Sequence, residues 1–121
     1  MKVRESEEMY LETIYVLSQK NAALHAIDVA GELGYAKSSV SRAVNLLSDK
    51  GYITIDKFGH IELTSVGASK AKDIYERHSV ITELLIKVGA DRALAEENAC
   101  RIEHVISPEL FDILKKYSLK N

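Results

Sequence analysis

The chain has 121 residues, of which 46% are hydrophobic and 28% charged, with one Pro and six Gly. This composition is typical of a folded globular protein and argues against long disordered linkers, and the length allows one compact unit or two small lobes. The formal net charge of −2 means that binding to nucleic acid would need a local basic patch. A single Cys excludes an internal disulfide framework and fits a reducing cytoplasm. Neither a signal peptide nor an apolar run of the ~20 residues needed for a membrane span is visible.

The first predicted element is a helix over residues 6–19, which carries a broad apolar stripe. Met9 and Glu12 are three residues apart and are therefore neighbours on this helix. Met9 is either a core residue or a soft metal ligand, and Glu12 is either a surface carboxylate or a metal ligand.

Two shorter helices follow. The first, over residues 25–34, ends at Gly34, and the second, over residues 37–50, buries Val40, Val44 and Leu47 at helical spacing. Two helices joined by a tight turn that contains Gly are typical of a helix-turn-helix. The polar face of the second helix supplies the candidate DNA-binding residues, which are Lys37, Ser38, Ser39, Ser41 and Arg42.

The periodicity then changes to that of strands, at residues 52–56 and 60–64, with a hairpin tip at residues 57–59. A helix-turn-helix followed by a small hairpin predicts a winged helix. Residues 36–60 contain four basic and two acidic side chains, so the local balance is +2 within a protein of net charge −2. This modest positive charge lies where a DNA-binding surface would need it.

Three further helices are predicted, over residues 65–88, residues 91–104 and from about Ser107 onward. Gly89 ends the first of them, and Asp91 starts the second. Ser107 and Pro108 favour the start of the third, as cap and first-turn residue. An excess of apolar side chains after residue 72 predicts a homodimer through these helices; it comprises Val80, Ile81, Leu84, Leu85, Val88, Leu110 and Ile113.

One stretch near the C-terminus places a thiol, a carboxylate and an imidazole together. Glu103 and His104 follow Cys100 by three and four residues, so a helix would present all three on one face. This donor set suits a divalent transition metal, whereas the alternative is a packed Cys beside surface charges.

The chain resembles the metal-dependent transcriptional repressors of the diphtheria toxin repressor type, which include manganese-responsive regulators. Four stretches carry the resemblance, with Arg77-His78 between the third and the fourth; they are Glu8-Met-Tyr-Leu-Glu-Thr-Ile-Tyr15, Ser38-Ser-Val-Ser-Arg42, Leu63-Thr-Ser-Val-Gly67 and Cys100-Arg-Ile-Glu-His-Val-Ile-Ser107. The resemblance implies a mainly α protein, with a winged helix-turn-helix over residues 1–71 and a helical metal-binding and dimerisation domain over residues 72–121. The SH3-like domain of many members is expected to be absent.

The resemblance also implies metal ligands. A primary site would use Met9, Cys100, Glu103 and His104, with Glu12 as a possible further ligand. Met and Cys at these positions resemble the iron-responsive branch, whereas Glu12 matches a ligand of the manganese branch. An ancillary site would use His78 and Glu96, with Thr82 at the position of a family carboxylate and Glu83 beside it as a substitute.

These residues together predict a cytoplasmic, metal-activated repressor that is not an enzyme. The expected cofactor is Fe(II) or Mn(II), with Fe(II) favoured, and Co, Ni or Zn could substitute in vitro. The expected partners are a palindromic double-stranded DNA operator and a second copy of the chain. The alternative is a winged-helix transcription factor that is independent of metal or senses redox state. The chain lacks a Gly-rich phosphate loop and a His-Glu-x-x-His zinc motif, which argues against an enzyme.

Overall fold

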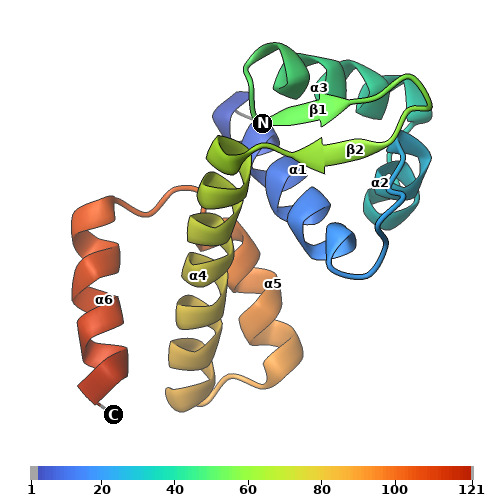
Figure 1. The fold of residues 1–121 in the computed structure, drawn as a ribbon. Helices are drawn as coiled ribbons and strands as arrows, with labels where there is room; N and C mark the ends of the chain where they lie inside the picture. The colour runs from blue at the N-terminus through green and yellow to red at the C-terminus, as the bar shows by residue number, and fades with distance from the viewer. Residues whose placement is uncertain (1–2, 121) are drawn as a thin grey trace. The chain divides into compact units, whose positions relative to one another are not determined.

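The structure, a computed structural model, describes residues 3–120, and within them it contains six α-helices and a two-stranded antiparallel sheet (Figure 1). This confirms the prediction of a mainly α protein with a small hairpin. The chain divides into two compact units between Lys72 and Asp73, one residue after the predicted boundary. Among the described residues, no helix is both long and apolar enough to cross a membrane.

The first unit is built from three helices and the hairpin (Figure 1). Its elements are α1 (Val3–Ser18), α2 (Ala26–Leu33), α3 (Lys37–Asp49), β1 (Ile53–Ile55) and β2 (Ile61–Leu63). Every helix and the hairpin contribute side chains to one core, which includes Leu11, Ile14, Val29, Val40, Leu47, Ile53 and Ile61. The predicted winged helix-turn-helix is therefore present.

The turn between α2 and α3 depends on Gly34, which ends α2 with a φ of 71°. This left-handed conformation is readily adopted only by glycine, which explains the chain reversal at this position. The Gly34 N–H donates to the Ala30 carbonyl at 2.8 Å, and the Tyr35 N–H donates to the same oxygen at 3.3 Å. Tyr35 therefore lies in the turn of the helix-turn-helix, two residues before α3 begins at Lys37.

The hairpin leads into α4 (Ser65–Lys87) through a close contact between backbones. Thr64 donates from Oγ1 to the Gly51 carbonyl at 2.7 Å and accepts from the Gly67 N–H at 3.1 Å. A Cβ added at Gly67 would lie 1.9 Å from the Tyr52 carbonyl oxygen. Only glycine fits so close to the Tyr52 carbonyl, which explains the glycine at the end of the Leu63–Gly67 stretch.

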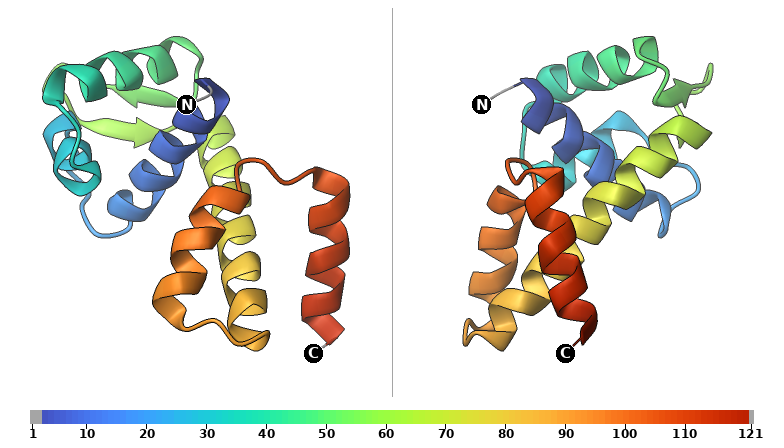
Figure 2. Two further views of the ribbon diagram at one scale, coloured as in Figure 1. Left: turned by 180° about the vertical axis from the view of Figure 1, so that it is seen from behind. Right: turned by 90° about the vertical axis from the view of Figure 1, so that its left-hand side faces the viewer.

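The second unit comprises the C-terminal part of α4 with α5 (Arg92–Ile102) and α6 (Pro108–Lys120). In Figure 1 and in the left-hand view of Figure 2, α4 lies between α5 and α6. Asp91 caps α5 by accepting from the Leu94 N–H at 2.8 Å, and Ser107 Oγ accepts from the Leu110 N–H at 3.2 Å. The predicted starts of both helices are confirmed.

The apolar faces of the second unit are only partly buried. Phe111 is the buried residue of α6, whereas Leu110 is 48% and Ile113 is 63% exposed. A groove of about 350 Å³ lies in this unit, and its lining includes Ile81 and Leu85 of α4, Val88 in the turn that follows α4, and Leu114 and Tyr117 of α6. We call this groove with Leu110 and Ile113 the α4–α6 face.

Candidate metal centre and DNA-binding surface

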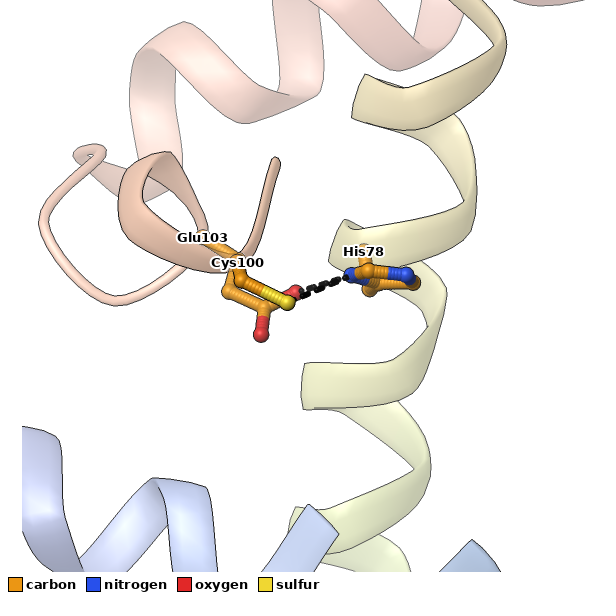
Figure 3. Close-up of side chains that lie close together, drawn as sticks. All are labelled: His78, Cys100 and Glu103. Carbon is orange, nitrogen blue, oxygen red and sulfur yellow. Dashed lines mark hydrogen bonds and ion pairs between the residues drawn. The ribbon is translucent and has the colours of Figure 1, made fainter. Parts of the chain in front are cut away.

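Three side chains with metal-binding atoms converge in the second unit (Figure 3). His78 on α4 faces Cys100 on α5 and Glu103 directly after it, and the ligand atoms of all three lie within 4.8 Å of one another. His78 Nδ1 lies 3.0 Å from Glu103 Oε2 and 3.8 Å from Cys100 Sγ. One nitrogen, one oxygen and one sulfur therefore point into a common space.

The end of α5 positions two of these side chains. The helix ends at Ile102, two residues earlier than predicted, but Glu103 retains helical dihedrals with φ −59° and ψ −26°. Cys100 and Glu103 consequently share one face, as the three-residue spacing predicts. His104 lies beyond the helix, in a turn in which the Ile106 N–H bonds the Ile102 carbonyl at 3.0 Å.

The donor set fits a divalent transition metal. For metal–ligand bonds of about 2.0–2.3 Å, the ligand atoms of a tetrahedral centre lie about 3.3–3.8 Å apart. Of the two distances from His78 Nδ1, 3.0 Å lies just below this range and 3.8 Å lies at its upper end. Thiolate, imidazole and carboxylate together are the ligands of borderline-soft cations such as Zn²⁺, Co²⁺ and Fe²⁺. Small side-chain movements would thus suffice to form a coordination sphere.

The electrostatics of the cluster favour a cation. The Glu103 side chain is fully buried, and His104 Nε2 lies 3.2 Å from its Oε1 atom. Hydrogen bonding to Cys100, and then to Glu103, raises the pKa of His78 from its ordinary 6.5 to about 10. Partial burial opposes this shift but is outweighed. In the absence of metal, a protonated His78 therefore supplies positive charge beside the buried carboxylate.

The structure groups His78 differently from the predicted ancillary pair of His78 and Glu96. Glu96 lies 3.7 Å and Glu83 3.3 Å from the guanidinium of Arg92, and both are exposed. Among the described residues, neither glutamate belongs to a group of three potential metal ligands. Thr82 is 3% exposed, and within residues 3–120 its hydroxyl has no hydrogen-bond partner.

On α1, Met9 and Glu12 both lie at partly buried positions of the first unit. The sulfur of Met9 accepts a hydrogen bond from the Tyr35 hydroxyl at 3.7 Å. This contact was not predictable from the sequence, because it joins residues 26 positions apart and depends on how α1 packs on the helix-turn-helix.

The candidate DNA-binding residues lie on α3, the second helix of the helix-turn-helix. Lys37, Ser38 and Arg42 are exposed, and Ser39 and Ser41 are partly exposed. The opposite side of the helix is buried in the core of the first unit through Val40, Val44 and Leu47. This amphipathic arrangement leaves the polar face of α3 accessible.

The basic character of this region is smaller than the count of charges indicates. Lys50 forms an ion pair with Glu7 of α1, so its charge is compensated. Lys57 at the hairpin tip lies 5.2 Å from the ring centroid of Phe58, which is 68% exposed. Of the four basic residues in 36–60, Lys37, Arg42 and Lys57 therefore remain as candidates for contact with a phosphate backbone.

Comparison with known proteins covers nearly the whole chain. Residues 2–61 match the N-terminal DNA binding domain of the iron dependent repressors, and residues 64–119 match their metal binding and dimerisation domain. An uncharacterised HTH-type transcriptional regulator of Methanocaldococcus jannaschii is 32% identical over 118 residues, which cover 96% of this chain and 94% of that protein. The transcriptional regulator MntR of Escherichia coli is 26% identical over 98% of this chain and 76% of its own length.

Solved structures agree with this assignment. A hypothetical protein from Sulfolobus solfataricus is 28% identical and superposes with a TM-score of 0.74 over 98% of this chain and 92% of that chain. The manganese regulator SloR is 26% identical, with a TM-score of 0.81 over 92% of this chain and 52% of that chain. This chain therefore spans about half the length of SloR.

The two matching domains lie in the same order as the two structural units. The family is one of DNA-binding transcriptional regulators, not of enzymes. The chain belongs to the iron-dependent repressor family of metal-dependent transcriptional regulators.

Proposed function

We propose that this protein is a repressor that binds a palindromic operator as a homodimer when a divalent metal is bound, with Fe(II) favoured over Mn(II). The observation that carries the proposal is the convergence of His78, Cys100 and Glu103 in the unit that matches a metal binding and dimerisation domain. A regulator of this kind acts on DNA in the cytoplasm.

The proposed ligands are Cys100, Glu103 and His104 at the end of α5, together with His78 of α4. Met9 and, secondarily, Glu12 are proposed as further ligands in the metal-bound protein, because they match the primary site that the family resemblance implies. The ion pairs that Arg92 makes with Glu83 and Glu96 compete with metal binding there. We therefore place no second metal on these two glutamates.

The protein's own groups explain why a cation is favoured at this position. Burial of the Glu103 carboxylate is costly unless a positive charge accompanies it. The His78 proton provides that charge in the metal-free protein. A bound divalent cation supplies more positive charge, so the deprotonated imidazole, carboxylate and thiolate can all act as donors.

For DNA binding we propose that α3 enters the major groove, as the second helix of a helix-turn-helix does. Ser38, Ser39, Ser41 and Arg42 are the candidates for contacts with bases and phosphates, and Lys37 is the candidate for a phosphate contact. In a two-fold dimer, two such helices reach half-sites about 10 bp apart or a multiple of that spacing. Metal can promote DNA binding only if it binds the DNA-competent conformation of the protein more tightly than the other conformations.

The proposal is tested by titrating Fe(II), Mn(II), Co(II) and Zn(II) anaerobically while DNA binding is followed at fixed salt. Cys100→Ala and His104→Ala should remove most of the metal dependence, whereas Glu96→Ala, which alters an exposed residue of α5, should retain it. Circular dichroism and mass measurements establish that each variant folds and dimerises. If Cys100→Ala and His104→Ala still show the parent's metal dependence, these residues are not the metal ligands. A parent whose DNA binding responds to none of the four metals would instead indicate a metal-independent winged-helix regulator.

A further inference from the structure

The side chain of Met9 is held by a residue of the helix-turn-helix turn. The Tyr35 hydroxyl donates a hydrogen bond to Met9 Sδ, with a separation of 3.7 Å. The ring of Tyr35 also packs edge-on against Tyr10 of α1, with ring centroids 6.3 Å apart and an interplanar angle of 64°. Tyr10 is 6% exposed, whereas Tyr35 is 41% exposed. The ring of Tyr35 thus rests on a fixed surface, and its hydroxyl reaches the sulfur.

We propose that Tyr35 is a positioning residue that binds the Met9 sulfur in the metal-free protein and competes with metal for it. Capture of a metal by Met9 would then release the Tyr35 hydroxyl, and so act on the turn that precedes α3. This inference rests on the proposed function, in which Met9 is a metal ligand.

The sign of the coupling follows from the chemistry of a thioether. A sulfur atom that donates electron density to a cation becomes a weaker hydrogen-bond acceptor. Metal binding therefore weakens the Tyr35–Met9 hydrogen bond, whether or not both interactions fit the sulfur at once. Coupling between two binding events is reciprocal, so the hydrogen bond must weaken metal binding by the same factor.

The place of Tyr35 in the turn gives this competition a route to DNA binding. Its N–H bonds the Ala30 carbonyl at the end of α2, and α3 begins at Lys37. The hydroxyl of Tyr35 contacts Met9, the proposed metal ligand, whereas its ring packs on Tyr10 and its N–H bonds within the turn. Loss of the hydroxyl contact therefore removes a tie between α1 and the turn without removing the turn's own hydrogen bonds.

The hydrogen bond can be observed in the metal-free protein. The chain contains two methionines, Met1 and Met9, so labelling the methionine methyl groups with carbon-13 gives two resonances. Tyr35→Phe removes the hydroxyl and keeps the ring, and should shift the Met9 methyl resonance. Tyr52→Phe, which removes a hydroxyl elsewhere in the same unit, should leave that resonance in place. An unshifted Met9 resonance in Tyr35→Phe would overturn the proposed contact.

The competition is measured with Co(II) as the probe, since its absorption reports thiolate ligation. A hydrogen bond of ordinary net strength predicts that Tyr35→Phe binds Co(II) about two- to tenfold more tightly than the parent. The Co(II) concentration for half-maximal DNA binding should fall by the same factor. In the Met9→Leu background, where the acceptor is missing, Tyr35→Phe should have no effect on Co(II) affinity.

The outcomes separate this inference from the proposed function. Equal Co(II) affinity in the parent and Tyr35→Phe, or an equal gain with and without Met9, would refute the role of Tyr35 and leave the metal centre intact. A Met9→Leu protein that binds Co(II) as tightly as the parent would also refute it, because Met9 would not be a ligand. Absence of a cobalt–thiolate band in the folded parent would instead refute the metal centre itself.

Discussion

His78 Nδ1 lies 3.0 Å from Oε2 of the fully buried Glu103, so the protein places an imidazole against a carboxylate before any metal binds. The pKa of His78 is about 10 because Cys100 and Glu103 both accept hydrogen bonds from it. A proton thus occupies the position of the proposed cation, and the two must exchange.

Metal binding is therefore expected to release the His78 proton. At pH 7–8, below the pKa of about 10, His78 is protonated in the metal-free protein, and coordination requires the neutral ring. Apparent Co(II) affinity should rise with pH over this range, by up to about tenfold per unit for each proton released. Calorimetric titrations in buffers of different ionisation enthalpy count the protons.

His78→Gln is the matched variant for this measurement. It should bind Co(II) more weakly and release about one proton fewer per metal, since glutamine has no proton to lose at this position. The same proton count in parent and variant would contradict the role of His78. The raised pKa also stabilises the metal-free fold fully below pH 6.5, and this contribution is lost as pH rises through about 10.

Gly67→Ala is expected to destabilise the first unit. Its new Cβ would lie 1.9 Å from the Tyr52 carbonyl oxygen, so the backbone must move. Overpacking of this kind costs roughly 1–3 kcal/mol, and more where backbone has to shift. The free energy of unfolding in urea measures the loss.

Gly31→Ala is the control for that substitution. Gly31 lies inside α2, and a Cβ added there meets nothing within 4 Å. Alanine should therefore stabilise the protein by about 0.5–1 kcal/mol through helix propensity. Equal effects of the two substitutions would show that the close approach at Gly67 is not what constrains the fold.

The α4–α6 face is expected to form the dimer interface. Ile113 on this face is 63% exposed, and Ile27 on α2 is 60% exposed. Ile113→Glu should shift the metal-loaded protein toward the monomer, because it would bury a charge in an apolar interface. Ile27→Glu introduces the same charge elsewhere and should leave the mass unchanged. The masses are measured by light scattering at micromolar concentration. A monomeric mass for the metal-loaded parent would contradict the proposed dimer.

Arg42→Ala is expected to weaken DNA binding and to reduce the salt slope by about one if the contact is to a phosphate. Ser39 substitutions should change sequence preference more than overall affinity. Arg101, which is 74% exposed and paired with Glu97, provides the control, and Arg101→Ala should bind DNA like the parent. The measurement is fluorescence anisotropy on a selected operator, repeated at several salt concentrations. If Arg42→Ala bound DNA with the affinity of the parent, the proposed docking face would be wrong.

Local signals in the sequence predicted the elements well, because their causes are local. Gly34 ends α2 with a positive φ, and Asp91 and Ser107 cap their helices, as glycine and small polar residues do. Alternation of Ile and polar residues predicted both strands. The C-terminus of α5 was less predictable, since the helix ends at Ile102 while its dihedrals continue to Glu103.

Features that depend on packing between elements were not predictable in the same way. The grouping of His78 with Cys100 and Glu103 requires α4 and α5 to lie side by side, which spacing within one helix cannot reveal. On α6, helical spacing predicts one apolar face with Leu110, Ile113 and Leu114. Only the fold shows that Phe111 is buried while Leu110 and Ile113 remain exposed.

The choice of metal is expected to depend on the two sulfur-bearing residues. A thiol at Cys100 and a thioether at Met9 favour Fe(II) over Mn(II), because Mn(II) prefers harder oxygen ligands. The double substitution Met9→Asp with Cys100→Glu would replace both sulfurs by carboxylates. It should raise the Mn(II) response relative to Fe(II) by about tenfold, which corresponds to roughly 1.4 kcal/mol. Glu12→Gln in the parent should change this ratio little.

The measurement is the metal concentration for half-maximal DNA binding, taken anaerobically at fixed salt. A ratio that stays constant in the double variant, or that collapses in Glu12→Gln, would show that oxygen ligands rather than sulfur set the preference.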